Sequence, residues 1–155
     1  MKRITGDPAD VDITRDHTTG RWGPGTTNKD NSLMANLFVK AKGLEFFGTY
    51  ELANGTYVTG KEFRFNQYAV EGLYRFGNNE QFYGGIRYNF VRGNTDLSAS
   101  EYQSVNRIQL AAGWFILKST VLKVEYVNQN YNDFIAVYGA SAGFKGLMIE
   151  NAISF

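Results

Sequence analysis

Strict alternation of apolar and polar residues is the feature of this sequence that most limits its possible folds. In one segment Phe82, Ile86 and Phe90 fall on one face of an extended chain, and Arg87 and Asn89 fall on the other. A period of two places successive side chains on opposite faces of a strand, whereas a helix repeats every 3.6 residues or so. The pattern therefore predicts a β-strand with one apolar face and one polar face.

The same alternation recurs after residue 32 and predicts several further strands. The expected strands cover residues 33–40, 44–52, 67–76, 81–90, 107–116, 122–127 and 147–155. The chain is also rich in residues that favour antiparallel strands and turns, with 12 Phe, 10 Tyr and 17 Gly. We therefore expect an all-β fold, an antiparallel meander of about seven to eight strands that forms all or part of a transmembrane β-barrel. An eighth strand would come from residues 1–14.

Residues 1–32 differ in composition from the rest of the chain. Both prolines, Pro8 and Pro24, lie in this stretch, together with a single aromatic residue, Trp22. Asp, Thr, Gly and Asn are frequent, and no apolar periodicity is sustained. We expect a polar loop or arm over residues 1–32 and the barrel strands over residues 33–155. The first residues lack the apolar run of a signal peptide, which leaves open a signal already removed or an incomplete chain.

The connections between the expected strands alternate in length. Short connections are expected at residues 42–43, 77–79 and 118–119, and long ones at 53–63, 93–103 and 130–142. Successive connections of a meander lie at opposite ends of the sheet, so the short turns would gather at one end and the long polar segments at the other. Strands of about ten residues with this asymmetry are typical of transmembrane β-barrels.

Periodicity alone does not distinguish a soluble barrel with an apolar interior from a transmembrane barrel with an apolar exterior. Aromatic residues near the expected strand ends favour lipid, because an interfacial girdle places them there. They are Tyr50, Tyr68, Phe76, Phe82, Phe90 and Tyr126. Gly48, Gly72 and Gly84 lie in the apolar stripe, where they would leave gaps in a soluble core but matter less against fluid lipid.

The C-terminal alternation through Ile153, which ends in Phe155, resembles the assembly signal of bacterial outer-membrane proteins. With the pattern over residues 33–155, the chain resembles a gram-negative outer-membrane β-barrel, most like the C-terminal portion of a general or phosphate-selective porin. The resemblance implies a place in the lipid bilayer of the bacterial outer membrane and recognition by the outer-membrane assembly machinery through Ile153 and Phe155. It also implies passive diffusion of small hydrophilic solutes, with the short turns in the periplasm and the long segments outside the cell.

Bacterial single-chain barrels have an even number of strands, so seven strands suggest one part of a larger barrel. The resemblance also leaves open a homo-oligomer or a larger membrane complex. Two alternatives to a channel remain. One is a non-conducting structural or partner-binding outer-membrane barrel, and the other is a soluble lipocalin-like barrel that binds an apolar ligand.

Charged residues on the polar stripe are the candidate pore-lining groups. They are Glu45, Glu71, Arg75, Arg87, Arg107, Lys123 and Glu125. In one interpretation the basic members form a row that guides anions. In the other they pair across strands with these carboxylates and with Glu51, and so keep the lumen hydrated and charge-balanced.

The composition excludes several other kinds of site. The chain has no cysteine and a single histidine, His17, which excludes thiolate zinc sites, cysteine nucleophiles and multi-histidine metal sites. No serine, histidine and aspartate arrangement can be nominated around one loop histidine, so we expect no enzyme, no metal and no cofactor. The balance of 16 basic against 15 acidic residues gives no reason to expect a nucleic-acid partner.

Overall fold

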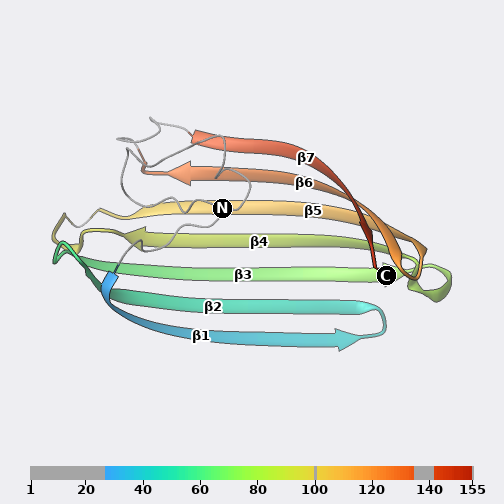
Figure 1. The fold of residues 1–155 in the computed structure, drawn as a ribbon, viewed down its shortest axis with the longest axis horizontal. Helices are drawn as coiled ribbons and strands as arrows, with labels where there is room; N and C mark the ends of the chain where they lie inside the picture. The colour runs from blue at the N-terminus through green and yellow to red at the C-terminus, as the bar shows by residue number, and fades with distance from the viewer. Residues whose placement is uncertain (1–26, 100, 135–141, 155) are drawn as a thin grey trace.

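The computed structural model describes residues 27–99, 101–134 and 142–154, which form a single seven-stranded sheet (Figure 1). The strands are β1 (Thr27–Ala41), β2 (Leu44–Tyr57), β3 (Glu62–Phe76), β4 (Phe82–Asn94), β5 (Gln103–Leu117), β6 (Thr120–Asn132) and β7 (Ala142–Ile153). Two short 3-10 turns, η2 (Asn78–Glu80) and η3 (Leu97–Ala99), lie between strands. Each strand pairs antiparallel with the next one along the chain, which confirms the predicted all-β meander.

The strands extend further than predicted toward the end where long connections were expected. β1 begins at Thr27, so the predicted boundary of the polar arm at residue 32 is wrong. β2 continues to Tyr57 and β3 begins at Glu62, which leaves residues 58–61 in place of the expected connection at 53–63. The extension of β1 over residues 27–32 is polar and does not alternate in hydropathy, but backbone pairing such as Asn31 with Asn54 needs no apolar side chain.

The turn between β1 and β2 has the backbone that a tight hairpin requires. Lys42 has φ 48° and Gly43 has φ 81°, so both central residues are in the left-handed region. Two positive φ values are the signature of a type I′ turn, whose twist matches that of the strands it joins. The Gly43 carbonyl also accepts a hydrogen bond from the Arg75 amide at 2.8 Å, which ties the turn to β3.

The two faces of the sheet differ in chemistry and in exposure. The outer face, defined by Leu37, Ile86 and Ile149, carries large apolar side chains that are 58%, 55% and 70% exposed. The inner face, defined by Glu71, Arg87, Gln109 and Glu125, carries most of the charged side chains of the strand centres. Several inner-face residues are almost fully buried, so side chains shield one another on this side of the sheet.

Gly113 on β5 gives the inner face one of its closest contacts. Tyr83 is its partner on β4, and the Tyr83 ring occupies the space that a Cβ atom at position 113 would need. The same ring packs against Phe115, with centroids 5.9 Å apart. An aromatic ring laid over a glycine covers a stretch of backbone that would otherwise be bare.

Gly113→Ala is therefore expected to lower the free energy of unfolding by about 1–3 kcal/mol, because the Tyr83 ring must leave its place. Gly84→Ala is the matched control, since a Cβ there would meet nothing within 4 Å. A urea titration followed by tryptophan fluorescence measures both variants. Equal midpoints for the two variants would contradict the packing described for Tyr83.

An ion pair links two connections at the long-connection end of the sheet. Lys61 Nζ lies 2.8 Å from Asp96 Oδ2, and the Ser98 amide donates to Asp96 Oδ1 at 3.1 Å. The hydrogen bond from Lys61, helped by those from Ser98, lowers the pKa of the Asp96 carboxyl from 3.8 to about 2. The contact thus fixes the β4–β5 connection against the β2–β3 turn.

Because the pKa of Asp96 is lower in the folded state, its stabilising contribution is complete above about pH 4 and disappears as the pH falls through about 2. A carbon-detected NMR titration of the Asp96 carboxyl is expected to give a midpoint near that lower value. Lys61→Gln should move the midpoint back toward 3.8. A midpoint that this substitution leaves unchanged would mean that the ion pair does not form.

Candidate functional site

A continuous row of polar contacts crosses the inner face from β3 to β5. Arg87 Nη1 lies 3.5 Å from Glu71 Oε2, and Arg87 Nε donates to Asn89 Oδ1 at 3.1 Å. Asn89 Nδ2 in turn donates to Gln109 Oε1 at 3.3 Å. The strand register makes this possible, because Glu71, Arg87 and Gln109 are cross-strand neighbours.

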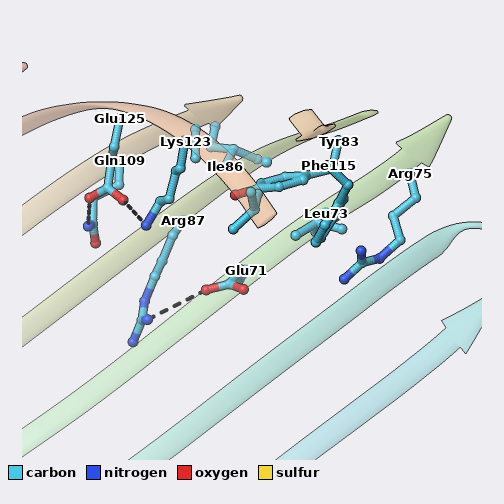
Figure 2. Close-up of a pocket in the computed structure, with 13 residues that line it drawn as sticks. Glu71, Leu73, Arg75, Tyr83, Ile86, Arg87, Gln109, Phe115, Lys123 and Glu125 are labelled. Atoms are coloured by element: carbon cyan, nitrogen blue, oxygen red, sulfur yellow. Dashed lines mark hydrogen bonds and ion pairs between the residues drawn. The ribbon is translucent and has the colours of Figure 1, made fainter. Parts of the chain in front are cut away.

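The row continues from β5 to β7 through a carboxylate with several partners. Gln109 Nε2 donates to Glu125 Oε1 at 2.6 Å, and Lys123 Nζ lies 2.7 Å from Glu125 Oε2 (Figure 2). Lys123 also lies 3.9 Å from Glu150 on β7. The Glu125 side chain is only 9% exposed, whereas that of Glu150 is 65% exposed. Glu125 is therefore the buried acceptor that joins Gln109 and Lys123 in this half of the row.

A second charged group lies near the short-turn end of the sheet. Arg75 Nε donates to Glu45 Oε1 at 3.0 Å, and Lys40 Nζ lies 2.8 Å from the same oxygen. The Arg75 guanidinium also lies 5.5 Å from the centre of the Phe115 ring, within range of a cation–π contact. Two cations thus share one carboxylate across β1, β2 and β3.

The structure places all seven predicted pore-lining residues on the inner face and brings most of them into pairs. Arg75 lies beside Glu45, Arg87 beside Glu71, and Lys123 beside Glu125. Arg107 is 5% exposed and donates through Nη1 to Gln129 Oε1 at 3.3 Å. This geometry matches the interpretation in which the charges balance one another and gives no support to a row of unpaired cations.

The predicted assembly signal is described only in part. Ile153 ends β7 and is paired with Thr120 of β6. Phe155 and His17 lie outside the described residues, as does the stretch 1–14 considered for an eighth strand.

A hollow on the inner face was not foreseen from the sequence. It has a volume of about 350 Å³, and its floor is formed by Gly85 and Ala111, which are cross-strand partners. Tyr83, Phe115 and Leu73 line it toward the short-turn end, and the charged row lines it on the other side (Figure 2). The signal was present in the sequence as small residues at positions 85 and 111, which fall on the polar stripe of their strands.

Sequence reasoning also missed an apolar cluster on the inner face toward the long-connection end. Its members are Ala53, Phe63, Phe65, Val91, Val105 and Phe134, all less than a tenth exposed. Phe63 and Phe65 fell outside or at the edge of the predicted strands, so their shared face was not apparent. The inner face is therefore charged in its centre and apolar toward one end.

Neither of the 3-10 turns in the described ranges is long enough to cross a bilayer as a helix. Within the same residues, no group of three or more His, Cys, Asp or Glu side chains is arranged to hold a metal ion. No protein-family model matches this sequence, and no curated protein or solved structure is significantly similar to it.

Removing the Glu125 carboxylate is expected to be destabilising, because Lys123 would keep only its longer contact with the exposed Glu150 and the Gln109 amide would lose its acceptor. We expect Glu125→Ala to lower the free energy of unfolding by about 1–3 kcal/mol. Glu150→Ala is the control on the same lysine, and its exposed, longer contact predicts a change below about 1 kcal/mol. Similar urea midpoints for the two variants would show that the inner row is not an energetically connected unit.

Proposed function

We propose that this chain forms a wall of an outer-membrane β-barrel that allows small hydrophilic solutes to diffuse passively. The observation that carries the proposal is the reversed distribution of side chains: apolar residues are exposed on the outer face, and paired charges line the inner face. A soluble lipocalin-like barrel would need the opposite arrangement, with the apolar stripe facing inward. In lipid the observed arrangement is the stable one.

The spacing of two aromatic rows on the outer face supports this proposal. Phe76, Phe82 and Trp114 stack side by side near the short turns, with centroid separations of 5.8 Å and 6.0 Å. At the other end Tyr68 stacks on Phe90 at 4.9 Å. From residue 68 to residue 76 the strand rises roughly 27 Å, or about 21 Å along the normal for a tilt of about 40°. That height is close to the apolar band of about 25 Å in such barrels.

Polar residues appear on the outer face around the second aromatic row. Asn66 and Asn128 occupy outer positions beside Leu52 and Ile108, and Asn106 is paired with Phe90. Amide side chains on several strands of one face are expected where the hydrocarbon ends and the headgroups begin. The apolar band thus has a boundary on both sides.

The direction of the edge strands bears on how such a wall would close. In the described sheet β1 and β7 are the edges, and because every neighbouring pair is antiparallel they run in the same direction. Direct pairing of β1 with β7 would therefore be parallel. A barrel with antiparallel pairing throughout needs an odd number of additional strands between them, which is consistent with a wall that belongs to a larger barrel.

One observation favours a second candidate, a non-conducting structural or partner-binding barrel. Phe63 is fully buried, and Phe65, Val91 and Val105 are at most 4% exposed, although all belong to the apolar cluster of the inner face. A water-filled passage would leave such side chains in contact with solvent. If the cluster spans the whole lumen, the barrel has no continuous aqueous path.

The test compares two lysine substitutions at the same level of the sheet. Ile86→Lys on the outer face should sharply reduce insertion of the full protein into lipid vesicles, since a lysine at mid-bilayer costs about 2–4 kcal/mol there. Gln109→Lys on the inner face should insert as well as the unmodified protein. Insertion is measured by protection of the strands from protease.

Planar-bilayer recording of the same full protein completes the test. A conducting pore with weak preference between anions and cations is expected, because the inner charges are paired. Insertion without conductance would transfer support to the non-conducting barrel. Folding in water without lipid or detergent, with both lysine variants equally stable, would contradict either membrane proposal.

A further inference from the structure

We propose that the hollow above Gly85 and Ala111, named here the inner groove, is a binding site for a neutral saccharide. The inference adds a ligand class to the proposed channel and rests on that proposal only for the route by which the ligand arrives. The inner groove has a volume of about 350 Å³, which is within the range of small-molecule sites. The inner groove is lined by four strands, β3 to β6, rather than by a connection between strands.

The floor of the inner groove exists because small residues alternate with large ones along the strands. On β4, Gly85 lies between Tyr83 and Arg87, whose Cα atoms are separated by roughly 13 Å for an extended chain. Ala111 is the partner of Gly85 on β5, so the depression continues across two strands. A space of that length between an aromatic side chain and a guanidinium accommodates one or two sugar rings.

One wall of the inner groove is apolar and held in position. The Tyr83 ring is fixed over Gly113 and packs at 5.9 Å against Phe115, with an angle of 48° between the rings. Leu73 lies beside them (Figure 2). The carbon-bound hydrogens of a pyranose form an apolar face that fits against such aromatic rings. Because the rings are already ordered by their neighbours, little side-chain entropy is lost when a ligand binds.

The opposite wall offers donors and acceptors side by side. Glu71 and Arg87 are 39% and 46% exposed and only 3.5 Å apart, and Lys123 beside Glu125 is 33% exposed. A hydroxyl group both donates and accepts, so adjacent hydroxyls can bridge a carboxylate and a cation without separating them. Hydrogen bonds to charged groups are stronger than those between neutral groups.

The same pairing disfavours an anionic ligand. Each cation of the inner groove lies beside a carboxylate: Arg75 beside Glu45, Arg87 beside Glu71 and Lys123 beside Glu125. A phosphate or carboxylate would have to displace one of these partners and then face its negative charge. A neutral ligand encounters no such repulsion, and this is why we infer a saccharide rather than an anion.

The test uses the full protein in detergent micelles, where binding does not depend on conductance. Maltose and inorganic phosphate are the probes, and saturation-transfer NMR with a concentration series gives each dissociation constant. Maltose is expected to bind and phosphate to show no saturable binding. Gly85→Leu, which fills the floor, should weaken maltose binding at least tenfold. Gly84→Leu, one residue away on the outer face with open space around it, should not change it.

A second variant keeps the test valid if Gly85→Leu does not fold. Phe115→Ala removes one aromatic ring without adding volume and is also expected to weaken maltose binding at least tenfold. Both groove variants should unfold cooperatively in urea, which shows that each is folded before the titrant is added. Saturable phosphate binding without maltose binding, or equal maltose affinity in Gly85→Leu and Gly84→Leu, would overturn the saccharide site. Maltose binding in a protein that never conducts would keep the site and remove the channel.

Discussion

Continuous backbone pairing between consecutive strands is the constraint on which the rest of this structure depends. Within the described strands the register is maintained over nearly the full length of every pair, and shifts occur only between Thr27 and Lys29 and between Phe115 and Leu117. Because side chains alternate with a period of two, a slip by one residue would exchange the two faces of a strand. The exposed apolar outer face, and the row of ion pairs and the hollow on the inner face, all follow from that one alignment.

The centres of the strands could be predicted from the sequence, whereas their ends could not. Phe82, Ile86 and Phe90 alternate with polar residues so regularly that strand, face and length follow directly. Residues 27–32 carry no such pattern, and their place in β1 depends on backbone pairing with residues 53–57. Phe65 was likewise hidden, because most of its neighbours in the apolar cluster come from other strands, such as Ala53 of β2 and Val91 of β4.

The charged residues mark the limit of sequence reasoning in another way. The alternation placed Glu45 and Arg75 on one face, but they are 30 residues apart in the chain. Whether such residues repel a solute, guide it or neutralise each other depends on which side chain each faces across the sheet. That information lies in the register of β2 with β3, which pairs Glu45 with Leu73, next to Arg75 on the same face. The charged residues can be identified from the sequence, but which of them form ion pairs depends on the alignment of the strands.

The meander order has a consequence for how the chain reaches its final form. Each strand pairs only with strands next to it in the sequence, so the sheet can form one hairpin at a time. Contacts between neighbours in sequence have low entropic cost of closure, and topologies built from them fold faster than those that join distant segments. The turn of Lys42 and Gly43 is a natural starting point, since its left-handed backbone already directs β2 back along β1. At every stage of such growth the last strand has unpaired backbone N–H and C=O groups along its edge, and these can pair with the next strand.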